Sequence, residues 1–123
     1  MTLSSLAQTP SLGSCLLERD ITGTIGTNSS GKEWRSDLER EFSRVSSSST
    51  RGSNLAVLLE FWIDKNRQTG NRLDSDNLAK PVLDSMKKAG IIYDDSLIDC
   101  LLVIKHRTSS QEHLEVSIWE WVN

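Results

Sequence analysis

The sequence has no long hydrophobic run and little cysteine. No segment of its 123 residues approaches the roughly 18 consecutive apolar residues that span a bilayer. Its first residues show neither a basic region nor an apolar core, so we expect no secretory signal there. The only two cysteines, Cys15 and Cys100, form no close motif. These features predict a reduced, cytoplasmic protein.

Histidine and positive charge are also scarce. The two histidines, His106 and His113, fall in a turn-like region, and a zinc site needs more ligands than they offer, so we expect ordinary polar residues. A formal net charge of −3 is not typical of a protein that binds nucleic acid. Residues 65–107, however, carry eight Lys or Arg against six acids. If three of those acids bound a divalent cation, this segment would become clearly basic.

The composition predicts one folded domain. Apolar residues make up 37% of the chain and charged residues 25%, which allows a buried core. Residues 1–14 are rich in Ser, Thr and Gly, and their apolar residues show no helical or strand periodicity. We therefore expect a flexible arm there, followed by a single domain over 15–123. Residues 15–25 predict one short strand or an edge hairpin.

Two segments have the apolar spacing of helices. A stripe with spacings of 4, 4 and 3 residues predicts a helix over 33–45. A second stripe predicts a helix over 78–89, with Gly90 as the residue that ends it. Pro81 removes an early helix hydrogen bond, so we expect an irregular first turn or a later start.

Three further segments show the apolar patterns of strands, with apolar residues either at alternate positions or in a continuous stretch. Residues 55–64 alternate strictly and predict a strand with one core face. Segments 97–105 and 114–121 predict two strands paired as an antiparallel hairpin. The predicted fold is α+β, with a single mixed sheet of about four strands and two helices packed on one face.

Four tryptophans are many for a chain of this size. We expect Trp34 in the core, whereas Trp62, Trp119 and Trp121 fall on the sheet face away from it. A dimer partner covering that second face explains this pattern, and core packing or base stacking are alternatives.

Two acidic pairs flank the second predicted helix. Asp74 and Asp76 point the same way in an extended backbone and suit Mg²⁺ or Mn²⁺. Lys80 can reach the same pocket and contact a phosphate there. The simpler interpretation makes Asp76 a helix cap and Asp74 a loop acid, with Asp94 and Asp95 in a turn. Spacing alone favours the simpler interpretation.

The two motifs together resemble a known family. The chain has "DSDNLAK" at 74–80 and "KKAGIIYDD" at 87–95, then a strand ending "VIK" and a last strand ending "WEW". This order resembles the RusA family of Holliday junction resolvases, whose motif is Asp-x-Asp-Asn-x-x-Lys at the head of a helix, with an Asp-Asp pair after it. The resemblance covers about fifty residues well.

The resemblance implies specific roles. Asp74, Asp76 and Asp95 match the catalytic aspartates that bind the metal, and Lys80 matches an active-site lysine. Two further positions match supporting residues of the motif: Asn77 and Asp94. The basic residues that we expect to contact DNA are Arg72, Lys80, Lys105 and Arg107.

The implied function is a homodimeric endodeoxyribonuclease dependent on Mg²⁺, with Mn²⁺ as a substitute. It would resolve Holliday junctions or related branched DNA by paired, symmetric nicks. One alternative is a non-enzymatic relative that binds nucleic acid or protein without cleavage, which the acidic charge favours and the complete acidic set opposes. Another is a metal-dependent nuclease acting on a different nucleic acid.

Overall fold

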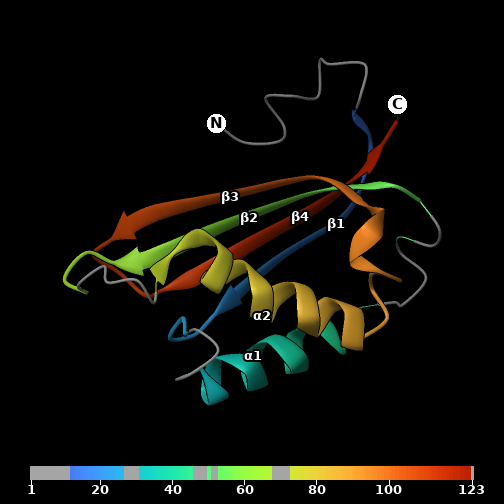
Figure 1. Cartoon of the computed structure of the whole chain (residues 1–123). Coiled ribbons are helices and arrows are strands. Elements are labelled where there is room, and N and C mark those ends of the chain that lie inside the picture. The colour runs from blue at the N-terminus through green and yellow to red at the C-terminus, as the bar shows by residue number, and fades with distance from the viewer. Residues whose placement is uncertain (1–11, 27–30, 46–49, 51–52, 68–72, 123) are drawn as a thin grey trace.

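A computed structural model describes residues 12–26, 31–45, 50, 53–67 and 73–122 of the chain. It shows one mixed four-stranded sheet and two helices, which confirms the predicted α+β fold (Figure 1). The elements in chain order are β1 (Leu12–Thr22), α1 (Lys32–Phe42), β2 (Leu55–Asp64), α2 (Ser75–Lys88), the 3₁₀ turn η3 (Asp95–Leu97), β3 (Ile98–Thr108) and β4 (His113–Trp121).

The strand order is β1-β4-β2-β3. Strand β4 pairs antiparallel with both β1 and β2, whereas β2 and β3 are parallel. Helix α2 makes the crossover from the end of β2 back to the start of β3, as parallel pairing requires. Both helices lie on the same face of the sheet (Figure 1).

The predicted hairpin of the last two strands is wrong. β2 lies between β3 and β4, so the short link from Thr108 to His113 passes over the end of β2. Glu112 in this link accepts a hydrogen bond from the Asp64 backbone N–H at 2.7 Å, which fixes the link there. Alternation in sequence predicts a strand but not its neighbour, and a strand buried on both faces takes the central place. Residues 55–61 are all buried.

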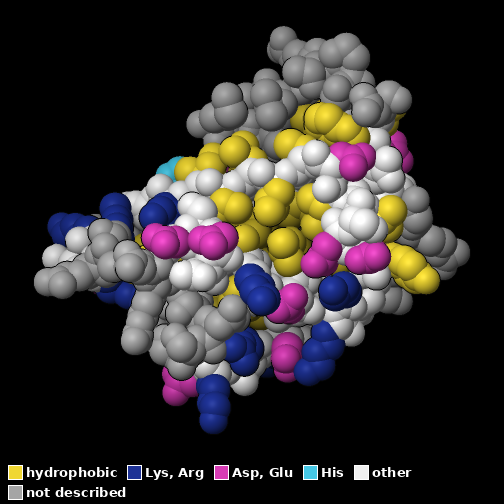
Figure 2. All heavy atoms as spheres, in the orientation of Figure 1, with side chains coloured by type: hydrophobic (Ala, Val, Ile, Leu, Met, Phe, Trp, Pro, Cys, Tyr) yellow, Lys and Arg dark blue, Asp and Glu magenta, His cyan; other side chains and the backbone are white. Residues whose placement is uncertain are grey.

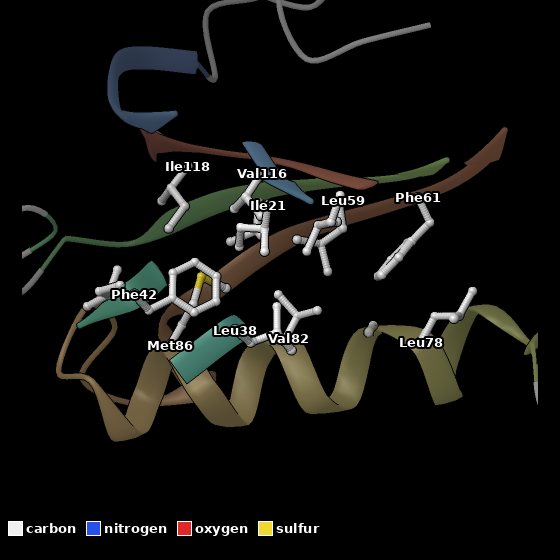
Figure 3. Close-up of a cluster of buried hydrophobic side chains, with 14 of the residues drawn as sticks. Ile21, Leu38, Phe42, Leu59, Phe61, Leu78, Val82, Met86, Val116 and Ile118 are labelled. Carbon is white, nitrogen blue, oxygen red and sulfur yellow. The ribbon is translucent and has the colours of Figure 1, made fainter. Parts of the chain in front are cut away.

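The main core lies between the sheet and the two helices (Figure 3). It combines the apolar stripes of both helices with the inward residues of the strands, and each such side chain contributes about 1.5–3 kcal/mol on burial. Trp34 is 1% exposed, as predicted. Fully buried side chains at the helix–sheet contact include Leu38, Phe42, Leu59, Phe61, Leu78, Val82 and Met86.

Element boundaries differ from the predictions at several places, including the end of α1 at Phe42 instead of residue 45. β1 begins at Leu12, inside the segment expected to be an arm, while residues 1–11 lie outside the described part. α2 begins at Ser75, three residues earlier than predicted, and continues through Pro81. The proline lacks only one backbone N–H, and the burial of Leu78 and Val82 against the sheet holds the helix together around it.

The sheet face away from the helices carries a second, smaller cluster. Ala56 and Leu58 are buried there, with Trp119 and Trp121 packed against them. This confirms that the two late tryptophans share one face. Cys15 and Cys100 are both free thiols. No helix in the described residues is both long and apolar enough to cross a membrane.

Candidate active site at the ends of helix α2

Asp74 and Asp76 lie at the N-terminus of α2. Asp74 occupies the N-cap position in an extended conformation, with φ −64° and ψ 148°, yet its carboxylate makes no capping hydrogen bond. Asp76 lies in the first turn. Both side chains are exposed, and neither carboxylate has a hydrogen-bond or ion-pair partner among the described residues. Helix capping therefore does not account for this pair, and both carboxylates remain available to a ligand.

The chemistry of this pair suits a hard cation. Mg²⁺ prefers oxygen ligands and commonly takes one or two carboxylates while keeping several waters. Asp74 and Asp76 supply two such carboxylates in solvent contact, so the residues present fit the ion that the sequence predicts. The positive end of the α2 dipole also favours anions at this position, including a phosphate.

Lys80 lies one turn beyond Asp76 on the same side of α2. Its side chain is exposed and lines a surface hollow of about 380 Å³ between α1 and α2. Arg35 and Lys88 line the same hollow, and Lys88 Nζ lies 3.1 Å from Glu39 Oε1. The hollow extends from Lys80 toward the C-terminal half of α2, and neither Asp74 nor Asp76 lines it.

Two predicted DNA-binding residues lie at the same end of the sheet. Lys105 Nζ donates a hydrogen bond to the Leu73 carbonyl at 3.1 Å, so β3 contacts the residue just before Asp74. Arg107 is exposed near the end of the same strand. Because β2 and β3 are parallel, their C-terminal ends share one edge with the start of α2, and Figure 2 shows Lys and Arg side chains gathered there. Arg72 lies outside the described residues.

The second acidic pair lies at the opposite end of α2. Asp94 occupies the N-cap position of η3 without a side-chain capping hydrogen bond, Asp95 begins the turn, and both side chains are exposed. Asp95 Oδ2 is 3.7 Å from Lys87 Nζ, in the last turn of α2. At a rise of about 1.5 Å per residue, Lys87 lies about 16 Å along the axis from Asp76. In Figure 2 the acidic side chains form separate groups with hydrophobic side chains between them.

A single chain therefore does not bring Asp74, Asp76 and Asp95 together. Among the described residues, one group of three potential ligands has its ligand atoms within 4.8 Å of one another, and it contains none of these aspartates. The cause is the crossover. Because β2 and β3 are parallel, the C-terminal end of β2 and the N-terminal end of β3 lie at opposite ends of the strands. The ion site shared by all three remains a prediction.

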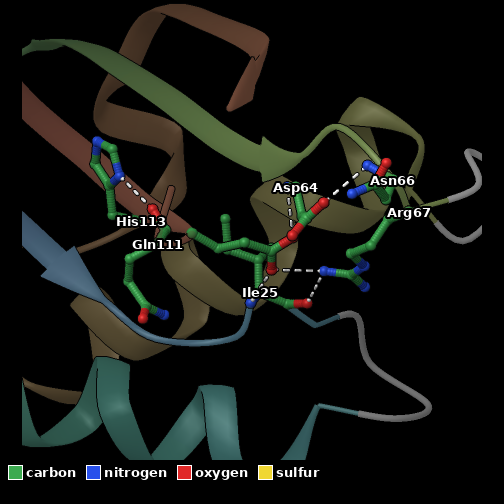
Figure 4. Close-up of polar contacts among 7 residues, drawn as sticks. Ile25, Asp64, Asn66, Arg67, Gln111 and His113 are labelled. Carbon is green, nitrogen blue, oxygen red and sulfur yellow. Dashed lines mark hydrogen bonds and ion pairs between the residues drawn. The ribbon is translucent and has the colours of Figure 1, made fainter. Parts of the chain in front are cut away.

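Glu112 holds the chain in place near this site, and the sequence pattern did not predict that role. The Glu112 carboxylate is buried and accepts hydrogen bonds from the backbone N–H groups of Ile25, at 3.0 Å, and Asp64, at 2.7 Å (Figure 4). It also pairs with Arg67 Nη1 at 2.7 Å. These contacts fix the end of β2, from which the chain continues to Asp74. Glu112 lies in a segment predicted as a turn, where buried acids are unexpected.

Asn77, the remaining motif residue, is partly buried in the first turn of α2. Its supporting role remains a prediction.

The comparisons with known proteins identify the family. The family model described as endodeoxyribonuclease RusA matches residues 18–119, which are 102 of the 123 positions. The matched region runs from β1 to β4 and contains both acidic pairs and Lys80. No curated protein matches the sequence significantly. Because the model covers most of the chain, this protein belongs to the RusA family of endodeoxyribonucleases.

Proposed function

We propose that the protein is a metal-dependent endonuclease that resolves four-way DNA junctions or related branched DNA by paired nicks. The observation that carries this proposal is the exposed pair Asp74 and Asp76 at the start of α2, which has no partner among the described residues, in a chain of this nuclease family. The helix dipole favours acids at this position, and a cation held by both carboxylates would also offset their mutual repulsion.

The residues have distinct roles in this proposal. Asp74 and Asp76 hold a Mg²⁺ ion, for which Mn²⁺ can substitute, and Lys80 contacts the scissile phosphate and offsets its charge. When bound, the ion supplies a Lewis acid and lowers the pKa of a water at the phosphate. The side chains of Lys105 and Arg107 contact the DNA backbone at the same edge of the sheet.

Asp95 joins this site only if a second copy of the chain supplies it. A two-fold axis perpendicular to α2 would place each end of this helix in one copy beside the opposite end in the other. The Asp95 end of one copy then meets the Asp74 and Asp76 end of its partner, and this happens twice by symmetry. Two equivalent sites result, which suits the cutting of two strands at a junction.

The free edge of β3 offers a contact surface for such a dimer. β3 is an edge strand of 11 residues, and an unpaired edge is a template for pairing with another chain. Exposed large hydrophobic side chains lie on or next to it: Tyr93 is 86% exposed and Leu101 is 44% exposed. Antiparallel pairing of two β3 strands would keep the helices of both copies on one face. The tryptophan-bearing face is the alternative contact, as predicted from the sequence.

The second candidate function is a non-enzymatic dimer that binds nucleic acid or protein. The net charge of −3 favours its protein-binding form, because a surface that is negative as a whole repels DNA. The exposed aspartates at the start of α2 and Lys80 oppose it, since a binding protein gains nothing from a carboxylate placed beside a phosphate.

A cleavage assay separates the two. A labelled four-way junction, a linear duplex of the same sequence and a single strand are incubated with the protein and Mg²⁺ or Mn²⁺. The proposal predicts paired nicks in the junction only, abolished by a chelator. Binding of the junction without any cleavage in either metal would establish the non-enzymatic alternative.

A further inference from the structure

We propose that Asp20, His113 and Glu115 form a second cation site, on the sheet face away from the helices, which takes a zinc-class ion. One ligand atom from each side chain lies within 4.8 Å of the others. Strand pairing creates the group: Asp20 on β1 lies directly opposite Glu115 on β4. His113 precedes Glu115 by two residues, so both side chains project from the same face of β4.

The imidazole of His113 is oriented as a ligand. Its Nδ1 lies 3.1 Å from the Gln111 carbonyl oxygen, and because a carbonyl can only accept, this nitrogen carries the proton (Figure 4). Its Nε2 lies 3.6 Å from Glu115 Oε1, and in the neutral imidazole this nitrogen carries the lone pair that a metal needs. Histidines that bind metals commonly donate their second N–H to a backbone carbonyl in this way.

Ring stacking holds that orientation. Trp62 stacks on His113 with a centroid distance of 5.5 Å and an interplanar angle of 9°. The other neighbour of Trp62 is His106, stacked at 4.0 Å and held in turn by a 3.0 Å contact to Glu60. The imidazole of His113 is therefore braced by a packed row of rings rather than free in solvent.

The negative charges of the acidic side chains around the cluster also favour a bound cation. Asp20 and Glu115 are cross-strand partners, and like charges in that position destabilise a sheet. Glu60 lies opposite Glu115 on the other side, which makes a row of three acids across three strands. His106 contacts Glu60, but no Lys or Arg among the described residues forms an ion pair with Asp20 or Glu115. A divalent ion between Asp20 and Glu115 removes the repulsion.

The ligand set indicates the class of ion. One imidazole nitrogen with two carboxylates suits Zn²⁺, which accepts three protein ligands and leaves a fourth position for water. The two aspartates of α2 offer oxygen only and suit Mg²⁺. A hollow of about 300 Å³, lined in part by Glu60 and Glu115, gives this face room for solvent. The two sites therefore differ in both place and preferred metal.

Calorimetric titration of the full-length protein with Zn²⁺, after treatment with a chelator, tests the site. We expect one Zn²⁺ per chain, and at least about tenfold weaker binding in Asp20→Asn and in His113→Asn. Asp20 is exposed, so its replacement leaves the fold intact even if His113→Asn does not. Glu18→Gln is the matched control, because Glu18 is an exposed acid two residues away on β1, and its variant should bind as wild type does.

Asp74→Asn separates this site from the one at α2. The inference requires that Asp74→Asn retains the tight Zn²⁺ binding, whether or not the protein cleaves DNA. Loss of binding in Asp74→Asn but not in Asp20→Asn would place the ion at α2 and overturn the inference. So would the absence of Zn²⁺ binding in wild type, or equal binding in wild type and Asp20→Asn.

Discussion

At the scale of single residues, the informative feature is a pair of exposed carboxylates for which the described part of the chain provides no partner. Asp74 occupies the position where aspartate normally caps a helix, and its side chain does not do so. Asp76 adds a second negative charge within one turn. The helix dipole stabilises such charges by about 0.3–1 kcal/mol each, but it does not remove their mutual repulsion. A bound cation does.

Replacement of Asp74 tests its role as a metal ligand. Asp74→Asn keeps the shape of the side chain and removes one negative charge from the ion site. We expect cleavage to fall by about a hundredfold or more, because electrostatic stabilisation at the reacting phosphate is lost. DNA binding should persist or tighten, since a carboxylate repels phosphate. Glu33→Gln, an exposed acid of α1, should cut as wild type does, and equal rates for Asp74→Asn would remove Asp74 from the mechanism.

Replacement of Lys80 should have a different signature. Lys80→Ala removes a phosphate contact, so both cleavage and DNA affinity should fall. The slope of the logarithm of DNA affinity against the logarithm of salt concentration should become less steep by roughly one, because one fewer counterion is released. Gel-shift titrations at several salt concentrations measure this slope, with Lys32→Ala on α1 as the control. An unchanged slope in Lys80→Ala would show that this lysine does not contact DNA.

At the scale of elements, the end of β2 is held by one buried acid. Glu112 bonds two backbone N–H groups and Arg67, and thereby joins β2, the loop after β1 and the link between β3 and β4. The chain leaves this junction toward Asp74, so the position of the candidate site depends on it.

The stability of that junction can be measured. Glu112→Gln removes the charge from an acceptor of two buried N–H groups, and we expect a loss of about 1–3 kcal/mol in the free energy of unfolding. Urea denaturation gives the value. Glu41→Gln breaks only an exposed ion pair with Arg44, so it should change stability by less than about 0.5 kcal/mol. A cost for Glu112→Gln no greater than this control would contradict the structural role.

The same scale explains what the sequence could predict. Alternation over 55–64 predicted β2 to the residue, and the acidic motifs with Lys80 predicted the family. Alternation carries no information on strand neighbours, so the parallel pairing of β2 with β3 was missed. The sequence left open whether the chain returns to bring Asp95 beside Asp74, and the parallel pairing decides against it. In the same way, only the pairing of β1 with β4 places Asp20 close to His113, and the sequence does not predict that pairing.

At the scale of the whole molecule, the account requires a dimer, and the β3 edge is the proposed contact. Leu101→Glu places a charge on that edge and should convert the dimer to a monomer that cuts poorly. Val122→Glu is a matched control, because Val122 is 48% exposed against 44% for Leu101 but lies beyond the end of β4. Light scattering reports the mass. A monomeric wild type would contradict the dimer, and a dimer that survives Leu101→Glu would move the contact elsewhere.

The most direct test of the central claim is complementation between two inactive variants. Asp74→Asn and Asp95→Asn chains carrying different tags are co-expressed, and the mixed dimer is purified through both tags. If each site takes Asp74 and Asp76 from one copy and Asp95 from the other, the mixed dimer has one intact site.

The account predicts that the mixed dimer nicks one strand of a four-way junction at roughly half the wild-type rate, one of two symmetric sites being intact. Each homodimer should be inactive. A mixed dimer of Asp74→Asn with Asp76→Asn is the control and should be inactive, because both of its sites lack a ligand. A mixed Asp74→Asn and Asp95→Asn dimer with no activity would contradict a site shared between two copies.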